Sequence, residues 1–292
     1  MRPQLLEKQD WPDFGDLPCT GDADRASWST VPVNVTERLP STLAGLIAID
    51  VVPGLVLAHR RSSDAIGVSN HRANEIVDEF AGLVLAQEIP ALMSYVNKLH
   101  LDGATIETLY LGLLSATARR LGEYWESDTI DFTSVTIGLW RLQEVLRSLS
   151  AEFQAEAPKP AHGHRALLLS TDGEQHNFGL AILGEFLFRD GWSVAGGPGL
   201  RPTEISRLLQ NEFFSIVGLT LSCESRLEAL TSIIRLVRRT SRNRGIVVMV
   251  GGSLFIQHPE LVALVGADAT APDARQGAIQ AERFISNLGR SP

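Results

Sequence analysis

Apolar residues recur every three or four positions between residues 74 and 154, a spacing that gives each helix one face for a core. Four such runs follow one another, and their apolar positions start at Ile76, Ala91, Ile106 and Ile137. Short polar breaks with turn residues separate the runs. The pattern predicts an all-α four-helix bundle over 74–154.

After residue 165 the pattern changes to short β-rich runs, each followed by an amphipathic segment. The runs fall at 166–170, 192–195, 216–220, 246–250 and 268–270. Parallel neighbours need crossover connections, so alternating strands and helices indicate a parallel sheet with helices on both faces. We expect a five-stranded, doubly wound, flavodoxin-like α/β domain over 165–292, with its ligand beyond the carboxyl ends of the strands.

The remaining segments are less regular. Residues 1–36 are rich in Asp, Pro, Ser and Thr without periodicity, which predicts a flexible N-terminal arm. Residues 37–73 have near-helical apolar spacing broken at Pro53, so a short helical lead-in is expected. Residues 155–164 contain two prolines and a glycine, which is typical of a linker between two domains.

The charge and the cysteine content exclude several classes of function. The 292 residues include 26 Lys and Arg against 34 Asp and Glu, so the net charge of −8 repels polyanions. Only Cys19 and Cys223 are present, which excludes a disulfide framework and a thiolate metal cluster. Neither a signal peptide nor a membrane-spanning apolar stretch is found, so we expect a cytoplasmic protein.

One basic run stands out in this acidic chain. It comprises Arg235, Arg238, Arg239, Arg242 and Arg244, late in a predicted helix. Cations are favoured at the carboxyl end of a helix, so a solvated face explains the run without any ligand. A patch that contacts DNA phosphates is the functional alternative, and both interpretations stay open.

The residues with chemistry follow the predicted strands. The first strand ends at Ser170, and the loop after it contains Glu174, His176 and Gly179. A histidine on such a loop can present one ring nitrogen to a metal while a nearby carboxylate holds the other. The third strand leads into Thr220 and Ser222, and the fourth into Gly251 and Gly252. These small groups would leave a groove at the same edge, wide enough for an extended ligand tail.

The motifs Glu-x-His-x-x-Gly at 174–179, Thr-x-Ser at 220–222 and Gly-Gly at 251–252 resemble the signature of cobalamin-binding domains. The resemblance covers 165–288, with Glu where Asp is usual and Thr and Ser where Ser and Leu are usual. It implies that His176 is the lower axial ligand of cobalt and that Glu174 holds its ring. The implied cofactor-binding set also contains Ser170, Gly179, Thr220, Ser222, Gly251 and Gly252.

The preceding bundle, with Gly-Glu-Tyr-Trp-Glu at 122–126, is similar to the helical cap that covers the corrin in such proteins. The resemblance places Trp125 over the upper face of the cofactor. Adenosylcobalamin photoreceptors with this cap have a Glu-His pair ten and eleven residues later, where this chain has Val135 and Thr136. That difference favours aquo- or hydroxocobalamin, and haem stays open as a second cofactor for the same histidine.

Residues 51–60 (VVPGLVLAHR), followed by the bundle and the Glu-x-His-x-x-Gly domain, resemble the AerR/PpaA antirepressors of photosynthetic bacteria. The resemblance implies a non-enzymatic, light-responsive regulator that binds cobalamin and acts on photosynthesis genes. Its implied partner is a repressor of the CrtJ/PpsR type, with DNA contacted indirectly or through the arginine run and no role for a membrane. A corrinoid carrier protein of a methyltransferase system is the alternative.

Overall fold

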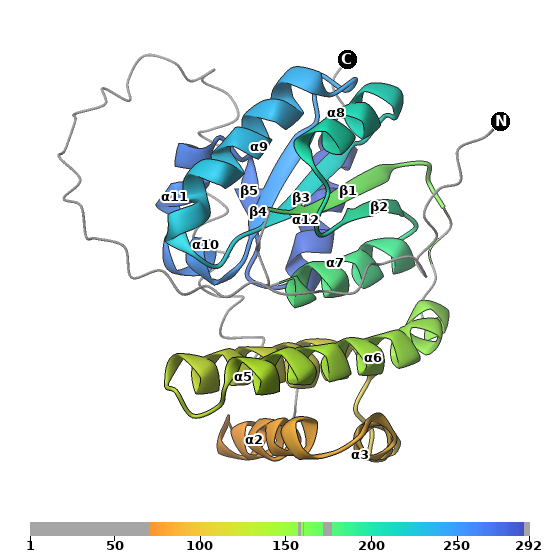
Figure 1. Ribbon diagram of the computed structural model, residues 1–292. Coiled ribbons are helices and arrows are strands. Elements are labelled where there is room, and N and C mark those ends of the chain that lie inside the picture. The colour runs from red at the N-terminus through yellow and green to blue at the C-terminus, as the bar shows by residue number, and fades with distance from the viewer. Residues whose placement is uncertain (1–69, 157–158, 160, 172–176, 289–292) are drawn as a thin grey trace.

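The computed structural model describes residues 70–156, 159, 161–171 and 177–288 (Figure 1). The N-terminal arm expected over 1–36, and all but the last residues of the lead-in expected over 37–73, lie outside the described residues. The described chain forms an all-α region followed by an α/β region.

The α region contains the four helical segments predicted from the apolar spacing. They are α2 (Asn70–Ala86), α3 (Ile89–Leu101), the continuous run α4 (Ile106–Thr108), η2 (Leu109–Leu114) and α5 (Ser115–Glu126), and α6 (Phe132–Glu156). Pro90 lies in the first turn of α3, and the Thr105 hydroxyl caps α4 by accepting a hydrogen bond from the Thr108 backbone N–H at 3.1 Å. Buried apolar side chains from all four segments form one core.

The α/β region confirms the predicted five-stranded parallel sheet. Its strands are β1 (Arg165–Ser170), β2 (Ser193–Gly197), β3 (Ile216–Thr220), β4 (Val247–Gly251) and β5 (Ala269–Thr270). Its helices are α7 (Phe178–Arg189), α8 (Pro202–Asn211), η3 (Glu224–Arg226), α9 (Leu227–Thr240), α10 (Ser253–Gln257), α11 (Glu260–Val265) and α12 (Ala274–Leu288). The strand order β2-β1-β3-β4-β5 is the flavodoxin-like order.

Alternate side chains of each strand reach opposite faces of the sheet. Leu168 and Ile216 belong to the core beneath α7 and α12, whereas Leu167 and Val217 belong to the core beneath α8, α9 and α11. Both faces are therefore covered, as parallel sheets require (Figure 1).

The α region is joined to the sheet region through α6 and α7. Phe153 of α6 and Phe186 of α7 lie in one shared core, with ring centroids 5.0 Å apart. The buried Glu185 accepts hydrogen bonds from Ser150 at 2.8 Å and from Gln154 at 2.7 Å. The two regions thus share a core and buried polar contacts, which holds the helical bundle on α7.

This joint places the first half of α6 past the carboxyl edge of the sheet. Residues 150–154 of α6 lie against Glu185, and α6 begins at Phe132, about 27 Å before residue 150 at 1.5 Å per residue. By the same measure α7 begins only about 10 Å before Glu185. The two helices run in the same direction, so α6 projects beyond the start of α7 on the side where α10 follows β4 (Figure 1).

Two histidines before β1 pack on the sheet region. The His164 ring lies 4.8 Å from the His162 ring and 5.7 Å from the Trp192 ring, centroid to centroid, and His164 Nδ1 is 3.1 Å from the Ser215 hydroxyl. Burial lowers the pKa of His164, the neighbouring His162 lowers it further, and Glu282 of α12 acts in the opposite direction. The fold therefore favours the neutral ring.

We expect the free energy of unfolding to fall as the pH drops below about 6.5, the pKa of an unfolded histidine. The unfolded chain takes up this proton more readily than the folded chain does, so acid favours unfolding. Urea unfolding of wild type and His164→Gln at several pH values between 5 and 8 measures the contribution. The variant should lose less stability toward pH 5, and equal slopes would contradict this account.

Candidate functional site

Three of the residues predicted from the sequence lie side by side at the carboxyl edge of the sheet. In the strand register Ser170 of β1 pairs with Thr220 of β3, and Thr220 pairs with Gly251 of β4. The chain leaves β1 for β2 on one side, whereas β3 and β4 lie on the other side, so this row adjoins the point where the strand order reverses. Ligands of doubly wound sheets bind at this point.

Buried hydroxyl groups mark the same edge. Ser170 Oγ and Thr171 Oγ1 are buried and have no hydrogen-bond partner among the described residues, and the same holds for Thr270 Oγ1 of β5. A buried hydroxyl without a partner costs about 1–3 kcal/mol. The cost is recovered if a bound molecule supplies the partner, so these groups point to a ligand. Thr171 and Thr270 were not predicted, although each lies at the carboxyl end of a predicted strand.

The glycines at this edge differ in whether the structure has room for a side chain at their position. A Cβ atom added at Gly179 would meet nothing within 4 Å, and one at Gly251 would meet only the Leu219 carbonyl oxygen, 4.0 Å away. A Cβ atom at Gly252 would collide with the Leu221 carbonyl oxygen, and Gly252 has a φ of 107°. Gly252 is thus required by the backbone itself, whereas Gly179 and Gly251 leave open space.

Glu174 and His176 lie outside the described residues, within 172–176. The two residues that flank this segment are described and buried. Thr171 follows β1, and Asn177 is the N-cap residue of α7. The segment that contains the predicted ligand histidine therefore begins and ends at the edge that carries the row Ser170, Thr220 and Gly251.

Ser222 lies two residues beyond the end of β3. The backbone between them is fixed, because Leu221 N–H donates to the Gly251 carbonyl oxygen at 3.0 Å. The free Cys223 follows, with its Sγ atom 2.8 Å from the Ser225 hydroxyl oxygen. The polar residues predicted after β3 thus continue the edge toward the start of α9.

The helical region faces this edge with the α5–α6 turn and the start of α6. Trp125, near the end of α5, is half-buried against the helical core. Val135 is buried, and the Thr136 hydroxyl donates to the Phe132 carbonyl oxygen at 2.8 Å. Trp140 of α6 is 43% exposed, which leaves a large aromatic surface that sequence reasoning missed.

The arginine run is only partly available for a partner. Arg238 donates to the carbonyl oxygens of Ile246 and Gly266 and forms an ion pair with Asp268 at 2.7 Å, so it fastens α9 to β4 and α11. The other predicted members, Arg235, Arg239, Arg242 and Arg244, are exposed. Arg238 is therefore partly engaged within the fold, and the interpretations of the run as a solvated face or as a DNA-contacting patch both stay open.

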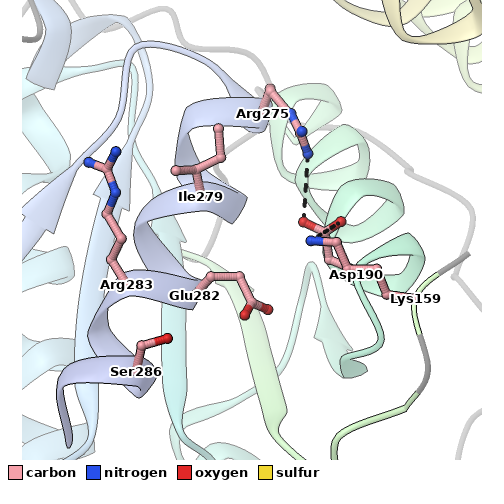
Figure 2. Close-up of a pocket in the computed structure, with 7 residues that line it drawn as sticks. All are labelled: Lys159, Asp190, Arg275, Ile279, Glu282, Arg283 and Ser286. Atoms are coloured by element: carbon pink, nitrogen blue, oxygen red, sulfur yellow. Dashed lines mark ion pairs between the residues drawn. The ribbon is translucent and has the colours of Figure 1, made fainter. Parts of the chain in front are cut away.

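Two cavities lie away from the carboxyl edge. One, of about 510 Å³, lies beside α12 at the end of α7 (Figure 2). There Asp190 forms ion pairs with Lys159 at 3.0 Å and with Arg275 at 3.7 Å, while Arg283 points away from this pair (Figure 2). The other, of about 430 Å³, lies between α9 and α11. Among the described residues, no three His, Cys, Asp or Glu side chains gather to hold a metal ion.

Comparisons with known proteins agree with the sheet region. The family model for the B12-binding domain matches residues 164–278. The chain is 32% identical over 170 residues to an uncharacterized 20.5 kDa protein in the bchF-crtJ intergenic region of Rhodobacter capsulatus, covering 58% of this chain and 87% of that protein.

No helix in the described part of the chain is long and apolar enough to cross a membrane.

Among solved structures, the monomethylamine corrinoid protein of Methanosarcina barkeri has a TM-score of 0.60 with 14% sequence identity. The match covers 74% of this chain and 99% of that protein. At this level of identity the likeness shows a common fold for the helical and sheet regions together.

Proposed function

Because this chain belongs to the AerR/PpaA-like family of B12-binding-domain proteins, we propose that it is a light-responsive transcriptional regulator that binds aquo- or hydroxocobalamin. It acts as an antirepressor, through a DNA-binding repressor of the CrtJ/PpsR type, on photosynthesis genes. The observation that supports the cofactor is the row of Ser170, Thr220 and Gly251, beside buried hydroxyls that lack partners in the described part of the chain.

The residues at this edge fit the cofactor. His176 would be the lower axial ligand of cobalt, and Glu174 would accept a hydrogen bond from the other ring nitrogen and fix the ring. The hydroxyls of Ser170, Thr171 and Thr220 suit a polar ligand tail that enters the groove between the strands. The open space at Gly251 leaves room for that tail.

The helical region supports a cobalamin without an adenosyl group. In the described bundle, Val135 is buried and Thr136 bonds its own helix, so these two positions provide no carboxylate or imidazole for an upper ligand. Trp125 and the exposed Trp140 offer apolar contact instead. Illumination would convert alkylcobalamin to the aquo form, and binding of that form by this chain would link its regulatory state to light.

Action through a partner fits the charge of the chain. A net charge of −8 opposes direct binding to DNA, and Arg238, one of the five arginines, is already paired with Asp268. Cobalamin can promote binding of the partner only if the conformation of this chain that binds the partner also binds cobalamin more tightly than its other conformations do. A pull-down with a CrtJ/PpsR-type repressor, with and without hydroxocobalamin, tests the regulatory role; equal recovery in both would contradict it.

The form of cobalamin separates the regulator from a corrinoid carrier. Purified chain is mixed with hydroxo-, methyl- or adenosylcobalamin in darkness and under light, and absorbance is recorded after gel filtration. We expect retention of hydroxocobalamin and of the product of illuminated alkylcobalamins. Retention of methylcobalamin in darkness, with demethylation by a thiol or folate partner, would favour the carrier function instead.

Thr171→Val tests whether the orphaned hydroxyl serves a ligand. The variant removes a buried hydroxyl that has no partner among the described residues, so the free energy of unfolding without cobalamin should rise by about 1 kcal/mol. Affinity for hydroxocobalamin should fall about tenfold, the loss expected for one hydrogen bond. Thr117→Val is the matched control, because Thr117 Oγ1 is also buried and finds no partner where the structure is described, but it lies within the helical core. Unchanged affinity in Thr171→Val would remove Thr171 from the site.

A further inference from the structure

The cavity of about 430 Å³ between α9 and α11 combines positive charge with an apolar floor. Arg235 and Arg239 lie one helical turn apart on α9 at its rim. Ile234, Leu264 and Val265 provide the apolar lining, and Leu264 is 70% exposed. We call this set of five residues the arginine groove.

The exposed guanidinium groups of the groove have no ion-pair partner in the described part of the chain. Neither Arg235 nor Arg239 has a carboxylate within ion-pair distance among the described residues, unlike Arg238, which is paired with Asp268. A groove with free cations and an exposed leucine fits an acidic peptide with large apolar side chains better than a DNA duplex, whose backbone presents mainly charged phosphates.

The sequence of this chain contains a segment with that chemistry. Residues 9–24 contain five Asp and no Lys or Arg. Within them, DWP-DFG-DLP at 10–18 repeats an acidic residue, an apolar residue and then Pro or Gly, so a carboxylate and a large apolar side chain recur every third position. In an extended chain with three residues per turn, each kind of side chain aligns along one edge. One edge would meet the arginines and the other the leucine.

The segment is tethered closely enough to reach the groove. It lies outside the described residues, and about 50 residues separate Asp16 from Asn70, where the described chain begins. About 50 residues span about 40 Å as a random coil and more where they are helical, and either span exceeds the radius of gyration of about 17 Å expected for the described chain. We propose that residues 9–24 bind the arginine groove of the same chain, with Asp10, Asp13 and Asp16 facing Arg235 and Arg239 and with Trp11 or Phe14 against Leu264.

The test uses the full-length chain without cobalamin, so its outcome does not depend on the proposed function. A photo-crosslinking amino acid replaces Leu264, and a mixture of ¹⁴N- and ¹⁵N-labelled chains is irradiated and analysed by mass spectrometry. We expect cross-links to residues 9–24 that join peptides of the same isotope. Arg235→Glu with Arg239→Glu should lower the yield about tenfold, because attraction becomes repulsion.

Charge reversal in the arginine groove and in residues 9–24 together distinguishes a direct contact from an indirect effect. Adding Asp10→Lys, Asp13→Lys and Asp16→Lys to the double variant should restore the cross-link. Arg72→Glu with Arg207→Glu is the matched control, because both arginines are exposed and lie outside the groove, and it should leave the yield unchanged. The proposal is overturned by cross-links of mixed isotope, which indicate a second copy; by cross-links that form only with added DNA; or by none to residues 9–24.

Discussion

Chains with His176→Ala should emerge from gel filtration without the absorbance of cobalamin, whereas wild type retains it. Removal of a hydrogen-bonding partner of a metal ligand typically costs 10–100-fold in affinity, so loss of the ligand itself should cost more than about 100-fold. Glu174→Gln, which keeps the side-chain length but removes the charge, should cost about tenfold, since His176 keeps its place. Titration of hydroxocobalamin followed by absorbance measures both.

A matched histidine variant separates ligation from general damage. His258 is exposed and lies 3.2 Å from Glu260, in a pairing that copies the carboxylate-histidine chemistry away from the sheet edge. His258→Ala should bind hydroxocobalamin as wild type does. If His176→Ala retained cobalamin at the wild-type level, the assignment of His176 as the lower ligand would be wrong.

Gly252→Ala should lower the stability of the fold, whereas Gly251→Ala should leave stability nearly unchanged and lower the affinity for cobalamin. Gly252 has a φ of 107°, and an added Cβ would strike the Leu221 carbonyl oxygen, so the backbone of β4 must shift. We expect a loss of about 3 kcal/mol or more in the free energy of unfolding, from the strained conformation together with the collision. At Gly251 the nearest atom lies 4.0 Å from the added Cβ, and stability should change by no more than about 0.5 kcal/mol.

The affinity for hydroxocobalamin should change in Gly251→Ala, the variant that keeps its stability. The methyl group of Gly251→Ala enters the space beside Thr220, where the ligand tail is proposed to lie, and we expect hydroxocobalamin affinity to fall about tenfold. Urea unfolding and cobalamin titration of the two variants measure both effects. Wild-type affinity in a stable Gly251→Ala chain would show that the tail does not pass this glycine.

Apolar periodicity and turn residues predicted the order of the strands and of the longer helices, but not the short helix α10. The apolar spacing located the helical segments of the bundle because each buries one face, and the β-rich runs located the strands because the sheet is buried on both sides. The π-helical turn η2 was not predictable, since its buried Leu109, Tyr110, Leu113 and Leu114 keep ordinary helical spacing. That turn depends on tertiary packing, including the Tyr110 hydroxyl, which donates to the Leu146 carbonyl oxygen at 3.2 Å.

The site residues that end a strand could be predicted from the sequence, whereas the contacts between residues distant in the sequence could not. Ser170, Thr220 and Gly251 each end a strand, so the topology brings them together. The structural requirement at Gly252 and the fixed position of Arg238 are set by atoms distant in the sequence. The absence of a partner for Thr171 Oγ1 among the described residues is likewise visible only in the structure. No local pattern encodes those contacts.

The joint between the two regions bears on how cobalamin would change partner binding. Phe153, Phe186 and the bonds from Ser150 and Gln154 to Glu185 form one buried contact between α6 and α7. Swinging the bundle away would expose this core. We therefore expect the response to cobalamin to be local, at the segment after β1 and the α5–α6 turn.

The most direct test of the cofactor site is electron paramagnetic resonance of the Co(II) cobalamin form bound to chain labelled with ¹⁵N only at histidine. An axial ¹⁴N nucleus splits each cobalt line into three, and an axial ¹⁵N nucleus splits it into two. The account predicts two-line splitting in the labelled wild type and its loss in His176→Ala. Three-line splitting in the labelled wild type would show that dimethylbenzimidazole stays on cobalt, which would contradict a histidine ligand at the carboxyl edge of this sheet.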